Sequence, residues 1–220
     1  MDIFYKMDGK AEVINLANVT AVQLDALALA CKKNTGGGGL DASKFSINVF
    51  PELSGLSAPI KAQILSQKDR EKDIIWKIDA LRVYTGKDSL AISDKTSAGN
   101  QKKFGTCVVI LPTPLSGGTL LLRNADNKLV VDPEKMLQGK GIGHISYVAF
   151  GTDPKPEVKK ESEGYCVIIT YSLYLSDGTQ TSDVEYLSSE PFVTALSKLL
   201  KDPKFLPKGG YLGFGLQQEY

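Results

Sequence analysis

The stretch 103-KFGTCVVILPTPLSGGTLLLR-123 holds two apolar runs separated by prolines, a serine and two glycines. The first run is 105-GTCVVILPT-113 and the second is 119-TLLLR-123. Short apolar runs bounded by Gly, Pro and Ser are typical of β-strands joined by turns. This stretch therefore predicts two consecutive strands.

The same pattern continues on both sides of this stretch. Further apolar or alternating runs are 74-IIWKIDALRVY-84, 128-KLVV-131, 144-HISYVAF-150 and 165-YCVIITYSLYL-175. A series of short strands separated by turn residues predicts an antiparallel sandwich or barrel. The runs at 147–150 and 165–174 flank a charged connection with a Pro-Lys-Pro, and they first suggest a hairpin joined across a rim. A barrel or sandwich of this kind has room inside for one small ligand.

Three other segments predict helices. Residues 20–33 are rich in Ala and Leu behind Thr20, which is a good N-cap residue. A second helix is predicted from Ser57 to about Asp73 with Pro59 in its first turn, and a third from Ser189 through 192-FVTALSKLLK-201. The run Gly36–Gly39 lacks the Lys-Ser/Thr of a phosphate-binding loop, so we expect a flexible loop there.

These elements predict one α+β domain over residues 1–220. We expect a helical N-terminal part at about 1–74, a β-rich core at about 75–176, and a C-terminal helix and tail at about 177–220.

Composition limits the partners. The formal net charge is +1, so we expect binding neither to nucleic acid nor to a membrane surface. The apolar runs are too short to cross a bilayer, and the first residues lack the apolar core of a secretory signal. The cysteines, Cys31, Cys107 and Cys166, are odd in number and lie in apolar contexts, which favours buried reduced thiols. We therefore expect a cytoplasmic protein.

The sequence offers few residues for catalysis or metal binding. His144 is the only histidine, so one chain cannot supply two imidazoles, and its position just before a predicted strand favours a structural role. Asp153 and Glu157 have the chemistry to ligate a hard metal, but surface charges at a rim are the commoner role. No glycine-rich nucleotide motif or nucleophile elbow is present.

Most of the chain resembles the Fe(II)/2-oxoglutarate-dependent oxygenase fold, in particular a group of fungal proteins. The resemblance rests on 81-LRVYTGKDSLAISDKTS-97, 103-KFGTCVVILPTPLSGGTLLLR-123, 145-ISYVAFGTD-153, 163-EGYCVIITYSLY-174 and 209-GGYLGFGL-216. It implies a double-stranded β-helix, or jelly-roll, core with flanking helices.

The family holds its metal with a His-x-Asp pair and a distal histidine, and its cosubstrate with an arginine. Aligned on the motifs above, these positions are Ser93 and Lys95 for the pair, Pro156 for the histidine and Cys166 for the arginine. Each family residue is thus replaced, and a second histidine is not available. The resemblance therefore implies an oxygenase-like protein without bound Fe(II) or 2-oxoglutarate.

A barrel that has lost its iron site has a less polar interior, suited to a small, flat organic molecule. The residues expected to line it are Tyr84, Ser93, Asp94, Lys95, Cys166 and Ile168. Strand alternation places Cys166, Ile168 and Thr170 on one face. The chain is also similar to coloured chromoproteins of oyster-type mushrooms, which implies a conjugated organic chromophore as the ligand.

Two alternatives stay open at this point. One is a divergent metal-dependent oxygenase that uses Asp94 with Asp153 or Glu157, together with His144. The other is a scaffold or storage protein that binds a partner and holds neither pigment nor metal.

Overall fold

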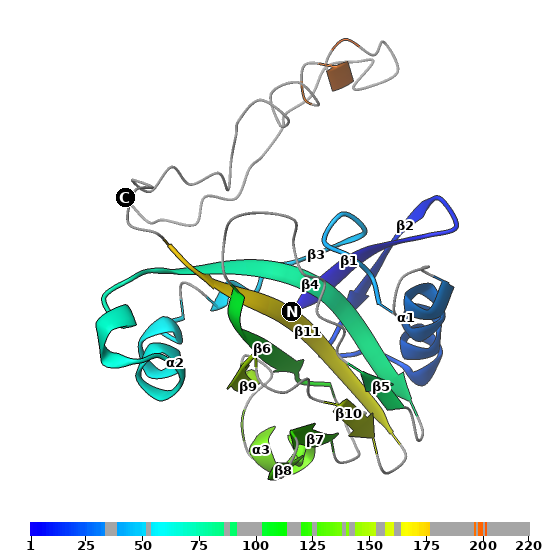
Figure 1. Ribbon diagram of the computed structural model, residues 1–220. Coiled ribbons are helices and arrows are strands. Elements are labelled where there is room, and N and C mark those ends of the chain that lie inside the picture. Colours follow the sequence, from blue (N-terminus) through cyan, green and yellow to red (C-terminus); the bar gives the residue numbers. More distant parts are fainter. Residues whose placement is uncertain are drawn as a thin grey trace. The chain divides into compact units, whose positions relative to one another are not determined.

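The computed structural model describes residues 1–33, 39–51, 54–85, 89–91, 103–113, 120–124, 127–137, 140, 144–152, 157–160, 164–176, 196, 198, 199 and 201. The strands are β1 (Asp2–Met7), β2 (Lys10–Asn15), β3 (Phe45–Ile47), β4 (Ile74–Thr85), β5 (Ser89–Ala91), β6 (Lys103–Leu111), β7 (Leu120–Asn124), β8 (Asn127–Val131), β9 (Ser146–Gly151), β10 (Glu157–Lys160) and β11 (Tyr165–Leu175). The helices are α1 (Ala21–Lys33), α2 (Ser57–Ile64), the short 3₁₀-helix η2 (Gln67–Asp69) and α3 (Pro133–Leu137). The fold is therefore α+β, as expected (Figure 1).

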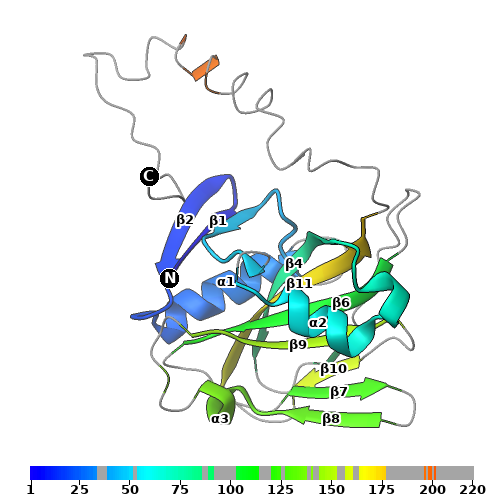
Figure 2. The ribbon, with the colours of Figure 1, turned by 90° about the vertical axis from the view of Figure 1, so that its left-hand side faces the viewer.

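Eight of the strands form two four-stranded antiparallel sheets, ordered β4-β11-β6-β9 and β5-β10-β7-β8. We call them the main sheet and the second sheet. Along the chain, β4 to β7 alternate between the two sheets, and so do β8 to β11. In both views the second sheet lies below the main sheet, whereas β1 and β2 lie above the main sheet (Figures 1 and 2).

All the strands predicted from apolar runs are present, but the predicted hairpin between 147–150 and 165–174 is wrong. β9 and β11 belong to the same sheet, and β6 lies between them. The connection contains β10, which joins the second sheet. The charged sequence of β10, EVKK, hid it from a search for apolar runs.

The N-terminal part holds strands as well as helices, so the expectation of a helical part at 1–74 is incomplete. β2, β1 and β3 form a three-stranded antiparallel sheet. Asp8 and Gly9 connect β1 to β2 with positive φ angles of 49° and 82°. Asp-Gly is a favoured pair for such a two-residue turn, because both positions require φ above zero.

Helix α1 confirms the predicted first helix and its N-cap. The Gln23 backbone N–H donates to Thr20 Oγ1 over 3.3 Å, and the Thr20 backbone N–H donates to Gln23 Oε1 over 3.0 Å. This reciprocal pair satisfies two donors that the first helical turn leaves open. The apolar side of α1 packs against the main sheet and β1 in one core cluster.

Helix α2 is shorter than predicted, since it ends at Ile64 rather than continuing to Asp73. Leu65 is extended, and Ser66 donates from its Oγ to the Asp69 carboxylate over 2.9 Å, which starts the separate turn η2. Arg70 then folds back on α2. Its Nη2 donates to the Ala62 carbonyl over 2.9 Å and its Nε to the Leu65 carbonyl over 3.2 Å. A side chain that binds the last carbonyls of a helix stabilises its end.

The larger core cluster lies between the main sheet, α1, α2 and β1. Trp76 and Tyr171 meet edge to face within it, with ring centroids 5.8 Å apart. Trp76 also donates from Nε1 to Ser57 Oγ over 3.3 Å, which ties the start of α2 to β4. The three cysteines are buried and form no disulfide bond, as predicted.

The chain divides into two units, residues 1–178 and residues 179–220. Most of the predicted C-terminal helix lies outside the described residues, but Leu196, Lys198 and Leu199 are helical. The predicted loop at Gly36–Gly39 also lies outside them, except for Gly39. Within the described part of the chain, no helix has the length and apolar character needed to cross a membrane.

We predict that Arg70→Ala destabilises the protein by about 1 kcal/mol, because the carbonyls at the end of α2 lose their hydrogen-bond donor. Urea unfolding followed by circular dichroism measures this change. Lys68→Ala is the matched control, since Lys68 is an exposed cation in the adjacent turn. Equal unfolding free energies for the two variants would contradict the capping role.

We also predict a loss of stability at alkaline pH that depends on two thiols. Burial raises the pKa of Cys31 to about 11 and that of Cys107 to about 12. Between the ordinary thiol pKa and these values, the unfolded chain loses protons that the folded chain keeps, so stability falls as pH rises. Urea unfolding between pH 8 and about 11 should show a shallower fall for the double variant Cys31→Ala, Cys107→Ala. An unchanged slope would contradict the assignment.

Candidate functional site

The main sheet has two faces of different character. Odd-numbered residues of β11 from Val167 to Leu173 pack into the larger core cluster beside α1 and α2. Cys166 and Ile168 belong instead to a second cluster that includes Val131 of β8 in the second sheet. We call the face that carries these even-numbered residues the inner face.

The register of the strands gives the layout of the inner face. The first row is the pair of Tyr84 and Cys166. The second row holds Arg82, Ile168, Ile110 and Ser146, and the third holds Ala80, Thr170, Val108 and Val148. The fourth row holds Ser172, Thr106 and Phe150. Each row after the first thus combines apolar residues with one or two polar ones, which are Arg82 and Ser146, then Thr170, then Ser172 and Thr106.

All the buried polar or charged residues of the described part lie on the inner face. They are Arg82, Thr106, Ser146, Thr170 and Ser172. Among the described residues, the buried side chains of the opposite face are all hydrophobic, and their polar atoms are those of Trp76, Cys107 and Tyr171. A sheet that only filled a core would have no reason to bury its polar residues on one side, so the inner face is the candidate functional site.

Arg82 is the charged group of this face, and its side chain is almost fully enclosed, with 6% exposed. Its Nη1 donates to Thr170 Oγ1 over 2.8 Å, and Thr170 Oγ1 donates in turn to the Ala80 carbonyl over 3.2 Å. Its Nε is buried and has no hydrogen-bond partner among the described residues. Thr170 thus positions the guanidinium group but leaves part of it unsatisfied.

Gly39 packs against the aliphatic part of the Arg82 side chain at the edge of the main sheet. Leu40 pairs with Leu81 on the outer edge of β4 through two backbone hydrogen bonds of 2.9 and 2.8 Å. This pairing brings Gly39 so close that a Cβ atom there would lie 2.9 Å from Arg82 Cγ and from the Leu81 carbonyl oxygen. Gly39 is therefore a packed position and not part of a flexible loop.

A second polar contact lies farther along the inner face. Ser172 Oγ lies 2.8 Å from both carboxylate oxygens of Asp79 and donates to this group. Asp79 is at the point where the register between β4 and β11 shifts. The extra residue in β4 thus places a carboxylate within hydrogen-bond distance of Ser172.

The structure brings together Tyr84, Cys166 and Ile168, three of the residues predicted to line a ligand site. Their role in binding stays a prediction. Ser93, Asp94, Lys95, Pro156 and Asp153 lie outside the described residues. The backbone of Glu157 is in β10, where its Cα partner in β5 is Ala91, two residues before Ser93.

Sequence reasoning missed Arg82, although a signal was present. In 81-LRVY-84, Arg82 has the same parity as Tyr84, which was assigned to the site. A charged residue at an inward position of a strand is rare and points to a function. The described part of the site therefore contains a buried cation that was not among the residues expected to line it.

Two other features concern the metal-dependent alternative. Among the described residues, no group of three or more His, Cys, Asp or Glu side chains could hold a metal ion. His144 is exposed and lies two residues before β9. Asp94 and Asp153 lie outside the described residues, so the proposed metal ligands are not tested as a set.

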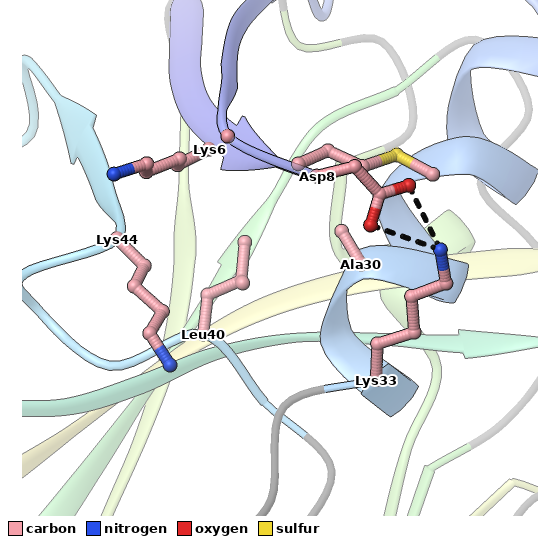
Figure 3. A pocket seen from close by; sticks show the side chains of 8 residues that line it. Lys6, Asp8, Ala30, Lys33, Leu40 and Lys44 are labelled. Atoms are coloured by element: carbon pink, nitrogen blue, oxygen red, sulfur yellow. Dashed lines mark hydrogen bonds and ion pairs between the residues drawn. The ribbon is translucent and has the colours of Figure 1, made fainter.

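A surface pocket of about 270 Å³ lies between the β1–β2 turn, the end of α1 and the start of β3 (Figure 3). Lys6, Lys33 and Lys44 line it together with Ala30 and Leu40. Asp8 binds Lys33 with contacts of 2.9 and 3.1 Å, and Lys44 forms an ion pair with Asp41. The charges of Lys33 and Lys44 are solvent-accessible and already paired, so this pocket is a weaker candidate than the inner face.

The sequence was compared with known proteins. No protein-family model matches it, and no curated protein matches it.

We predict that Thr170→Val destabilises the protein by about 1.5–3 kcal/mol, because Arg82 loses its hydrogen-bond acceptor in a buried place. The control is the same substitution in an Arg82→Met background, where no guanidinium group needs the hydroxyl. Urea unfolding of the four proteins gives the coupling energy between the two residues. A coupling near zero would contradict the positioning role of Thr170.

Proposed function

We propose that this protein binds a small organic molecule between the main sheet and the second sheet and catalyses no reaction on it. The observation that carries the proposal is the amphipathic inner face. Its apolar rows suit a flat hydrophobic body, and its buried polar groups suit a few directed hydrogen bonds. Ligand sites in proteins combine these two features.

The strand order supports a jelly-roll, or double-stranded β-helix, reading of the fold. In such a fold, eight antiparallel strands alternate between two sheets as the chain advances. The orders β4-β11-β6-β9 and β5-β10-β7-β8 follow this scheme. Enclosed β-folds of about eight strands have room for one small ligand between their walls.

The resemblance to Fe(II)/2-oxoglutarate oxygenases supports a binding role without the oxygenase reaction. Cys166, at the position of the family's cosubstrate arginine, is buried on the inner face beside Tyr84. A thiol cannot give the bidentate charged contact of a guanidinium group. We propose that the family's active site has been lost and its interior kept for a ligand, a conjugated pigment as in the chromoproteins that the sequence resembles.

The first experiment examines the purified full-length protein. We expect native mass spectrometry to show a bound small molecule that is lost on denaturation, together with an absorption band beyond that of Tyr and Trp. Elemental analysis of the same sample decides the alternative. Stoichiometric iron with 2-oxoglutarate turnover would replace our proposal with an oxygenase, and a protein with no bound molecule and no affinity for any would contradict it.

We predict that Tyr84→Phe changes the absorption spectrum or the affinity of the bound molecule, because Tyr84 lies on the inner face. Tyr171→Phe is a closely matched control. Both tyrosines are buried, with 3% and 2% exposed, but Tyr171 belongs to the opposite face. The measurement is the spectrum of each purified variant, with its binding affinity by titration. Equal effects of the two substitutions would contradict a ligand site on the inner face.

A further inference from the structure

No carboxylate in the described part of the chain forms an ion pair with Arg82. An arginine side chain keeps its positive charge in proteins. Arg82 is 6% exposed, and none of the ion pairs among the described residues involves it. Its hydrogen bond goes to the hydroxyl of Thr170, which is neutral.

A buried cation without a counter-charge is unfavourable, because it has lost its hydration and gained no equivalent partner. The Thr170 hydroxyl offers a dipole and occupies only Nη1. Nε, on the same planar group, is buried without a partner among the described residues. The Nε–H group of Arg82 can therefore still donate a hydrogen bond, and the described part of the chain provides no acceptor for it.

The neighbours of Arg82 indicate what kind of acceptor fits. Ile168 is directly opposite it on β11, and Tyr84 is two residues away on the same face. Beyond Ile168 lie Ile110 and Val108 of β6, both almost fully buried. An anion at Arg82 would thus have an apolar wall beside it.

We propose that Arg82 binds a carboxylate of the ligand, so that the molecule held on the inner face is an organic acid with a flat apolar body. The inference rests on the proposed binding function and specifies its ligand class. The carboxylate accepts hydrogen bonds from the guanidinium group and neutralises its charge. The apolar body lies against Tyr84, Cys166 and Ile168.

Calorimetric titration with a matched pair of probes tests this assignment. Cinnamate is a flat conjugated acid, and cinnamamide is its neutral counterpart of nearly equal shape. We expect the full-length protein, freed of any bound molecule, to bind cinnamate about tenfold or more tightly than cinnamamide, the ratio that one charged hydrogen bond supplies.

Three variants identify the origin of that preference. Arg82→Met keeps the length and bulk of the side chain but removes its charge, and we expect it to lose the preference for the acid while its affinity for the amide stays within about threefold. Arg82→Lys retains a cation and should keep part of the preference. Lys10→Met removes an equal charge from an exposed position on β2 and should behave as wild type.

The outcomes separate this inference from the binding function itself. If wild type binds acid and amide equally, or if Arg82→Met keeps the preference, the carboxylate assignment is overturned while ligand binding stands. If wild type binds neither probe, the assignment is overturned and the binding function loses support as well. Should Arg82→Met fail to fold, the wild-type preference and the Arg82→Lys titration still decide the question.

Discussion

The rest of the structure depends on the period-two alternation of β11. This strand lies between β4 and β6 and is buried over nearly its whole length. Its odd-numbered side chains complete the larger core with α1, α2 and β1, while its even-numbered side chains face the second sheet. A slip of one residue would exchange the two sets and place Thr170 and Ser172 in the apolar core. The core therefore fixes which side chains the inner face presents.

The inner face differs from an ordinary core because it carries a buried cation, Arg82, and the contacts that hold its side chain in place. Thr170 orients the guanidinium group of Arg82, and Gly39 leaves space for its stem at the sheet edge. The register shift at Asp79 directs the nearest described carboxylate of β4 to Ser172. Thr170 and Gly39 thus keep Arg82 in place without neutralising it. A buried cation held in this way lowers the stability of the protein without ligand and raises its affinity for an acid.

The sequence predicted the parts of the fold that depend on local pattern. Apolar runs located the strands of the main sheet, and Thr20 marked the start of α1. Strand β10 and the end of α2 were not predicted, for physical reasons. β10 is polar in sequence, and its pairing with β5 and β7 is a long-range contact that no local pattern contains. The end of α2 depends on Arg70 folding back on its carbonyls, while the alternating charges of 68–73 continued a helical pattern.

The candidate site was predictable in part. Parity along β11 placed Cys166 and Ile168 together, and the cross-strand partner of Cys166 proved to be Tyr84. The charge of Arg82 was visible in the sequence, but its lack of a counter-charge among the described residues required the structure. A crystal structure of the full-length protein, purified without added ligand, tests the central claim most directly. We predict density for an organic molecule on the inner face, with an acceptor about 3 Å from the Arg82 guanidinium group. Side chains of the second sheet filling this space, with one of the protein's own carboxylates bound to Arg82, would contradict the account.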